Sequence, residues 1–175
     1  MKNEKSSILK NALIWLIIIG ITLSIPQVLK VTLQTEYPLE VVVSGSMIPT
    51  LQVGDLIIVK GVTDGRDVYV GPDGDIIVFH RPGNPDELIA HRAVEKFLRG
   101  GTYYFRTKGD NNISIDGWII SEDDIVGKVV GRVPYVGYVL MFLSKPIGLV
   151  IAISVIAIII LHDLIPFIKE KIGGL

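Results

Sequence analysis

The sequence predicts a mainly β protein, in which a compact β domain is flanked by an N-terminal and a C-terminal transmembrane helix. Two long apolar runs without charged residues lie near the ends of the 175-residue chain, and the segment between them breaks into short β-branched runs separated by turn residues. The composition agrees with this fold class. Only 20% of the residues are charged and the mean hydropathy is +0.51, whereas soluble domains carry about 25% charged residues.

The first apolar run extends from Ala12 to Leu29 and contains no charged residue. About 18 such residues are enough for a membrane-spanning helix. A cleaved signal peptide is the alternative, but the run exceeds the usual apolar core of about 7–15 residues and no Ala-x-Ala site follows it. We therefore expect an uncleaved transmembrane helix over residues 12–31, preceded by a cytoplasmic segment, 1–11. Pro26 is expected to kink or end this helix.

The second apolar run extends from Pro146 to Leu161 and is also uncharged. It is slightly short for roughly 30 Å of hydrocarbon, and extension to residue 167 supplies the missing length. A buried core helix is the alternative, but the run is apolar on all faces, which a small domain could hardly cover. We expect a second transmembrane helix over residues 146–167, followed by a cytoplasmic tail, 168–175.

Lysine residues flank both predicted spans on the sides that face the chain ends. They are Lys2, Lys5, Lys10, Lys169 and Lys171. Short positive flanks predict that both ends of the chain lie in the cytoplasm. The β domain, residues 32–142, is then expected on the extracytoplasmic face of a multi-pass protein of the cell membrane.

Short apolar runs rich in β-branched residues fill the segment between the two spans, and no window shows the stripe of an amphipathic helix. Gly-Asp pairs and prolines separate the runs, which is typical of a compact β domain. Two stretches rich in Gly, Asp and Pro, Thr63–Asp75 and Arg81–Glu87, are expected to be surface loops. The predicted strands are Leu39–Val43, Leu56–Val59, Ile76–Phe79, Leu88–Val94, Thr102–Arg106 and Ile125–Val133.

Several function classes are disfavoured by composition. The chain has no cysteine, which excludes disulfides, thiolate zinc sites and a cysteine nucleophile. No cluster of His, Asp and Glu has the spacing of metal ligands, so we expect neither a metal nor an organic cofactor. The net charge is −1, so no excess of basic residues points to nucleic acid.

Nucleophilic catalysis in a chain without thiols falls to Ser, Thr or Lys. The segment Ser44–Thr50, SGSMIPT, places hydroxyl groups on a constrained loop at the end of a predicted strand. His91 lies in a largely apolar predicted strand, where a buried polar ring requires a partner. Asp110 and Asp116 lie in a turn-rich segment further along the chain, and a carboxylate there could orient a histidine. Each feature, taken alone, is also explained by ordinary turn or core chemistry.

The order of these motifs is more informative than each motif alone. The chain reads SGSMIPT, then GDIIVF, then HRA, then TKGDNN with Asp116 six positions after the Asp of that motif, and then GKVVGRVPYVG. Over residues 39–138 this series resembles type I signal peptidases, specifically the archaeal and endoplasmic-reticulum branch. The resemblance implies a signal-peptidase-like β domain, and a membrane-bound serine endopeptidase that removes N-terminal signal peptides from secreted preproteins and cuts after small residues.

The resemblance also implies a role for individual residues. Ser46, just before Met47, matches the nucleophile of the family. His91 stands where the bacterial branch has a general-base Lys, which identifies the archaeal branch. Asp116 matches the family's acid, and Asp110 matches a residue that supports activity. Ser44 matches the side-chain donor of the oxyanion hole, with the Ser46 backbone N–H as the second donor.

Rival interpretations remain open from the sequence. One is a Ser–Lys protease with Lys96 or Lys108 as base. A second is a non-catalytic, membrane-anchored β module of a translocation complex. A third, a transporter subunit, is disfavoured because its spans usually carry polar residues. The partners implied by the main interpretation are signal peptides, the lipid bilayer and the protein translocation machinery, with no nucleic acid.

Overall fold

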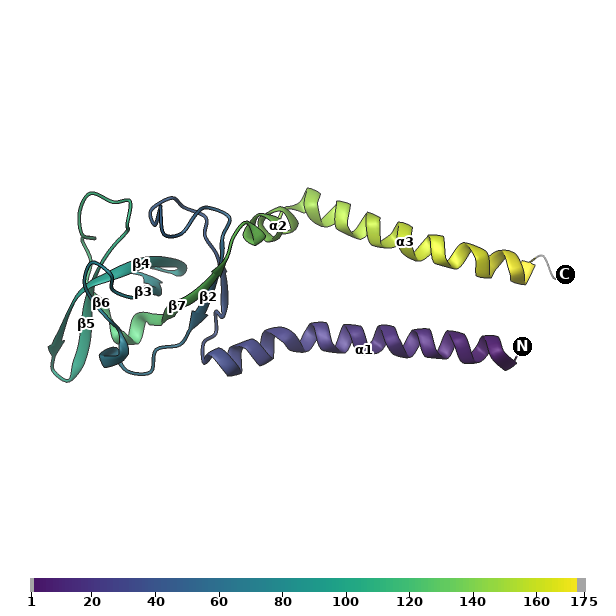
Figure 1. Ribbon diagram of the computed structural model, residues 1–175, viewed down its shortest axis with the longest axis horizontal. Helices are drawn as coiled ribbons and strands as arrows, with labels where there is room; N and C mark the ends of the chain where they lie inside the picture. Colours follow the sequence, from purple (N-terminus) through teal and green to yellow (C-terminus); the bar gives the residue numbers. More distant parts are fainter. Residues whose placement is uncertain (1, 173–175) are drawn as a thin grey trace.

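The computed structural model describes residues 2–172 of the chain and consists of one antiparallel sheet and three α-helices (Figure 1). Within these residues seven strands pair in the order β1-β2-β7-β3-β4-β5-β6. The mainly β prediction is confirmed. The strands are β1 (Leu39–Val41), β2 (Leu56–Lys60), β3 (Ile76–Arg81), β4 (Asn84–Arg99), β5 (Thr102–Lys108), β6 (Ile120–Ser121) and β7 (Ile125–Val133).

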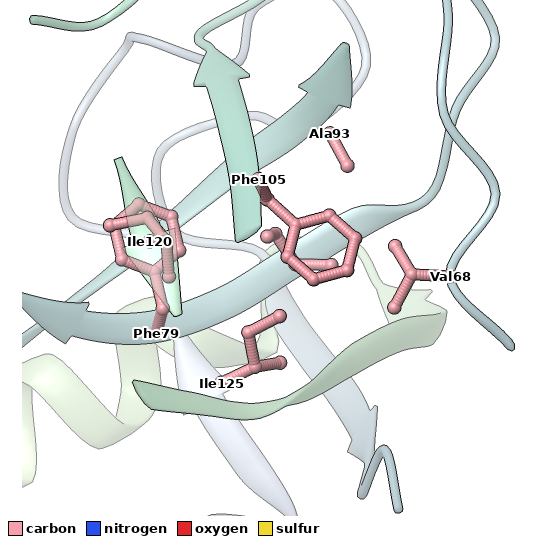
Figure 2. Close-up of a cluster of buried hydrophobic side chains, with 7 residues drawn as sticks. Val68, Phe79, Ala93, Phe105, Ile120 and Ile125 are labelled. Atoms are coloured by element: carbon pink, nitrogen blue, oxygen red, sulfur yellow. The ribbon is translucent and has the colours of Figure 1, made fainter. Parts of the chain in front are cut away.

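Strand β3 is buried on both faces and divides the apolar interior into two clusters. Because neighbouring side chains of a strand point to opposite faces, Ile77 and Phe79 belong to the first apolar cluster while Ile76 and Val78 belong to the second. Figure 2 shows the first cluster, to which Phe105 of β5 also belongs. Burial on both faces explains why this strand reads as a continuous apolar run rather than an alternating one.

The hairpin between β3 and β4 differs from the expected loop. We predicted a surface loop over Arg81–Glu87, but β4 begins at Asn84 and Arg81 pairs with it. The turn is tight because Gly83 adopts a positive φ of 83°, a conformation that glycine reaches without steric penalty. The polar start of β4 is exposed, so the apolar pattern used to predict strands carries no signal there.

The N-terminal helix α1 (Lys2–Leu33) contains a span, Leu13–Leu33, that is long and apolar enough to cross a membrane and is not buried against the rest of the protein. Pro26 was expected to kink or end the helix, but the helix continues past it to Leu33. The prediction that it ends there is therefore wrong. Figure 1 shows α1 leaving the same side of the β domain as the C-terminal helix.

The C-terminal region consists of two helices, α2 (Val136–Leu143) and α3 (Pro146–Ile172). Over the described residues, α2 and the part of α3 up to His162 have the length and apolar character of a span only when they are taken together, and they meet at a 94° bend. The sequence predicted no separate α2. Met1 and residues 173–175, which belong to the predicted cytoplasmic segments, lie outside the described residues.

Candidate active site

The loop after β1 carries Ser46 and is fixed from within the domain. Met47 and Leu51 are each 2% exposed and pack into the second apolar cluster. The carbonyl of Ser46 accepts a hydrogen bond of 2.8 Å from the backbone N–H of Asn111. The side-chain amide of Asn111 donates to the Gly45 carbonyl at 3.2 Å. Ser46 therefore projects from a loop that is tied both to the core and to the segment after β5.

His91 lies on β4 and contacts two of the other predicted site residues. Its Nε2 is 3.0 Å from Ser46 Oγ, and its Nδ1 is 2.6 Å from Asp116 Oδ2. The His91 side chain is only 8% exposed. The structure thus brings a hydroxyl, an imidazole and a carboxylate into one hydrogen-bonded series, although they lie on three separate segments of the chain.

Asp116 is held by the end of β5. Its backbone N–H donates to the Thr107 carbonyl at 2.9 Å, and its Oδ2 accepts a hydrogen bond of 2.7 Å from Thr107 Oγ1. Thr107 is part of the motif TKGDNN, but the sequence did not predict a role for it. Its position inside β5, where it is fully buried, depends on the strand register, which the sequence did not reveal.

Asp110 occupies a different position from the other predicted site residues. Among the described residues its hydrogen-bond partners are Arg92, at 2.8 Å and 2.6 Å, and Thr50, at 2.5 Å, rather than Ser46 or His91. Burial acts to raise the pKa of the Asp110 carboxyl, but the hydrogen bonds and the charge of Arg92 outweigh it and the pKa lies below its ordinary value. Arg92 and Thr50 were present in the quoted motifs HRA and SGSMIPT but were not identified as functional.

Ser44 lies beside Ser46, with 3.2 Å between the two Oγ atoms. Both residues, together with His91, line a groove whose lining is mostly apolar. Strands β1 and β4 border this groove. Among the described residues β1 pairs only with β2, and the part of β4 before Arg92 pairs only with β3, so each presents a free edge.

Neither lysine of the rival Ser–Lys interpretation forms a hydrogen bond with Ser46 among the described residues. Lys96 Nζ donates to the carbonyls of Gly65, Arg66 and Val68, at 3.4, 2.9 and 2.9 Å. For Lys108 the described residues include no hydrogen bond to Ser46. Among the residues that the structure describes, no group of three or more His, Cys, Asp and Glu side chains is placed to hold a metal ion.

Comparisons with known proteins show the family to which the chain belongs. No model of a protein family matches the chain. The signal peptidase complex catalytic subunit sec11 of Sclerotinia sclerotiorum is 39% identical over 124 residues, covering 67% of this chain and 70% of the relative. The SEC11 subunit of Pyricularia oryzae is 38% identical over 126 residues, with the same coverage of both chains. The SEC11 subunit of Metarhizium robertsii is 36% identical over 124 residues. These likenesses confirm the predicted family, and the chain belongs to the SEC11 catalytic subunits of signal peptidase, the endoplasmic-reticulum branch of type I signal peptidase.

Proposed function

We propose that this protein is a membrane-bound serine endopeptidase that removes N-terminal signal peptides from secreted preproteins by a Ser–His–Asp mechanism. The observation that carries the proposal is the hydrogen-bonded series in which Ser46 Oγ lies 3.0 Å from His91 Nε2 and His91 Nδ1 lies 2.6 Å from Asp116 Oδ2. A serine hydroxyl is a weak nucleophile at neutral pH and requires an adjacent base. The relatives are named as catalytic subunits of a signal peptidase complex.

In the first step Ser46 Oγ attacks the scissile carbonyl while His91 Nε2 accepts its proton. The tetrahedral intermediate collapses, the carbon–nitrogen bond breaks, and His91 returns the proton to the leaving amine. The signal peptide is then bound to Ser46 as an ester. Water, deprotonated by the same ring, attacks the ester. As the bond to Ser46 Oγ breaks, the ring returns the proton to that oxygen and the signal peptide is released. Asp116 accepts the Nδ1–H bond throughout, which keeps Nε2 free to act as the base and stabilises the imidazolium.

The negative oxygen of the intermediate is proposed to bind the Ser46 backbone N–H and the Ser44 hydroxyl. Ser44 Oγ lies 3.2 Å from Ser46 Oγ, and Ser44 is exposed. Donors arranged before the reaction stabilise the developing charge more than water does, because they need no reorganisation.

The substrate is proposed to bind as an extended segment in the groove. The free edges of β1 and β4 offer backbone donors and acceptors to an added strand. Val42, Met47 and Leu51 line the groove with apolar surface. Shallow subsites formed by such side chains accept small residues before the cut and exclude bulky ones.

Asp110 is proposed to act as a positioning residue. It binds Arg92, the neighbour of His91, and Thr50, which lies on the Ser46 loop. The adjacent Asn111 binds the carbonyls of Gly45 and Ser46. The segment after β5 thereby holds the nucleophile and the base at a fixed separation.

The membrane arrangement is also part of the proposal. Helix α1 anchors the protein, and α2 with α3 forms a second, bent span, so that the protein is multi-pass, with both ends in the cytoplasm and the β domain on the extracytoplasmic face of the cell membrane. Two observations support this arrangement. Helices α2 and α3, which meet at a 94° bend, are together long and apolar enough for a span, and α1 and α3 extend from the same side of the β domain (Figure 1). The bilayer and the translocation machinery are the proposed partners.

The test is cleavage of a purified preprotein by the full chain reconstituted in liposomes. The wild type is expected to cut a preprotein with Ala at the first and third positions before the site, and to leave one with Phe or Lys there intact. Ser46→Ala is expected to be inactive, while Ser154→Ala, on α3, serves as a control and is expected to remain active. Cleavage by Ser46→Ala would contradict the proposed nucleophile, and no cleavage by the wild type would favour a non-catalytic module.

A further inference from the structure

Thr107 is a fully buried polar residue that contacts the proposed catalytic acid and is not among the residues that line the substrate groove. Its Oγ1 lies 2.7 Å from Asp116 Oδ2. The same oxygen accepts a hydrogen bond of 3.3 Å from the Nε1–H of Trp118. Phe105 and Thr107 are the two buried residues of β5, and the partners that a buried hydroxyl binds indicate what it does in the structure.

The chemistry of the two neighbours fixes the direction of these hydrogen bonds. An indole N–H can only donate, and an ionised carboxylate can only accept. The single proton of the Thr107 hydroxyl must therefore point at Asp116. The Asp116 oxygen that receives this proton is also the one that accepts from His91 Nδ1, at 2.6 Å.

Two donors on one carboxylate oxygen determine the orientation of that carboxylate. The backbone N–H of Asp116 is in turn bound to the carbonyl of Thr107, so the same residue holds both the main chain and the side chain of the acid. The His91 ring is then presented with an acceptor at Nδ1, which selects the tautomer that leaves Nε2 unprotonated toward Ser46.

Trp118 links this arrangement to the substrate groove, since its side chain lines the groove together with Ser46 and His91. Its ring lies partly buried against the first apolar cluster. The indole therefore lies between the apolar interior and the groove, and its N–H orients the hydroxyl of Thr107.

We propose that Thr107 is a positioning residue of this reaction: its hydroxyl, oriented by the Trp118 indole, holds the Asp116 carboxylate in place for His91. This inference rests on the proposed function, because it assigns the residue to the same Ser–His–Asp series. It adds a residue that does not touch the substrate and acts only through Asp116.

The decisive variants are Thr107→Val and Thr107→Ser, compared in the preprotein cleavage assay with the full chain. Valine keeps the shape of the side chain and removes the hydroxyl, whereas serine keeps the hydroxyl and removes a methyl group. Thr107→Val removes the hydrogen bond to the charged Asp116. We therefore expect this variant to lower kcat by about 10- to 100-fold with little change in KM. Ser is expected to retain most of kcat. Thr102→Val, at the start of the same strand, is the matched control and is expected to behave as the wild type.

A packing role predicts the reverse order, because a buried site tolerates the isosteric Val better than a Ser that leaves a small void. Full activity of Thr107→Val, or equal losses in Val and Ser, would overturn the proposal.

Proton NMR of the full chain in detergent gives a readout that does not depend on cleavage. The chain has two tryptophans, Trp15 and Trp118, so comparison with Trp118→Phe assigns the indole resonance. Thr107→Val is expected to move the Trp118 indole resonance and the low-field His91 Nδ1 resonance, while Thr107→Ser moves neither. If the wild type fails to cleave but these shifts occur, the proposed function fails and the hydrogen-bonded arrangement stands. Unchanged resonances in Thr107→Val would overturn the arrangement even in an active peptidase.

Discussion

Arg92 binds the Asp110 carboxylate through two hydrogen bonds, Nε to Oδ1 at 2.8 Å and Nη2 to Oδ2 at 2.6 Å. Arg92 directly follows His91 on β4, and successive side chains of a strand point to opposite faces. One strand thus presents the proposed base on one face and, on the other, an arginine that fixes the segment after β5. The side chains of both partners are less than one-fifth exposed, at 17% and 14%, so solvent screens the pair only partly.

Asp110→Asn is expected to weaken the folded state in a pH-dependent way. The pKa of Asp110 is lower in the folded protein than its ordinary value, because the hydrogen bonds from Arg92 and Thr50 outweigh the effect of burial. Its contribution is therefore complete above the pKa of the unfolded chain and is lost as the pH falls through the folded-state value. The variant is expected to lower the free energy of unfolding by about 2 kcal/mol at neutral pH.

Denaturant unfolding at a series of pH values measures this effect. The difference between wild type and Asp110→Asn is expected to shrink as the pH drops below about 4, the ordinary pKa of an aspartate, and to be smallest below the lower folded-state pKa, where both forms carry a neutral side chain. Asp86→Asn, on the exposed start of β4, is the control and should show little difference at any pH. A deficit of Asp110→Asn that stays constant down to strongly acidic pH would contradict the ion-pair account.

Ser44→Ala is expected to slow turnover without preventing substrate binding. If the Ser44 hydroxyl binds the developing oxyanion, its loss lowers kcat by about 10²–10³-fold and leaves KM nearly unchanged. Steady-state kinetics on a preprotein measure both constants. Ser44→Thr, which keeps a hydroxyl at the same atom, is expected to recover part of kcat. Equal kcat values for wild type and Ser44→Ala would remove this residue from the oxyanion hole.

Lys96→Met separates the proposed mechanism from its Ser–Lys rival. The Lys96 ammonium binds three backbone carbonyls of residues 65–68. Its loss is expected to leave kcat unchanged and to lower the free energy of unfolding by about 1 kcal/mol. Turnover and thermal unfolding of the same preparation give both values. A variant that folds normally and cannot turn over would revive lysine as the base, and Lys108→Met extends the same test to the other candidate.

Leu51→Ala is expected to loosen the loop that carries the nucleophile. Leu51 is 2% exposed in the second apolar cluster, and truncation of such a residue lowers the free energy of unfolding by about 2–5 kcal/mol. Because the same loop carries Ser46, kcat is expected to fall as well. Leu98→Ala, at a side chain 59% exposed on β4, is the control. Equal stability of the two variants, measured by denaturant unfolding, would contradict an anchoring role.

The sequence predicted the strands best where burial is greatest. The run Ile76–Phe79 was identified because it is buried on both faces, whereas the polar start of β4 and the two-residue β6 carry too little apolar pattern to be found. Helix α2 was missed for a different reason. Its residues come before Ser144 and Lys145, which interrupt the apolar run at the 94° bend, so they were counted with the β domain rather than with the second span.

In the proposed site, the sequence motifs identified some residues, whereas contacts that depend on the register of the strands were not predicted. Ser46, His91 and Asp116 stand out because their residue types and order match a known family. Thr107 and Arg92 lie inside the same motifs, yet their contacts depend on the side to which each strand position points. That property follows from strand pairing, which the sequence alone did not determine.

The most direct test of the account is the turnover number of His91→Ala and of Asp116→Asn on one defined preprotein, each compared with the wild type in liposomes. Removal of the base is expected to abolish measurable cleavage, and the amide in place of the acid, which favours the wrong tautomer of the ring, is expected to lower kcat by about 10⁴-fold. Circular dichroism should show both variants folded. Cleavage by folded His91→Ala at a rate near that of the wild type would contradict the central claim that this imidazole activates Ser46.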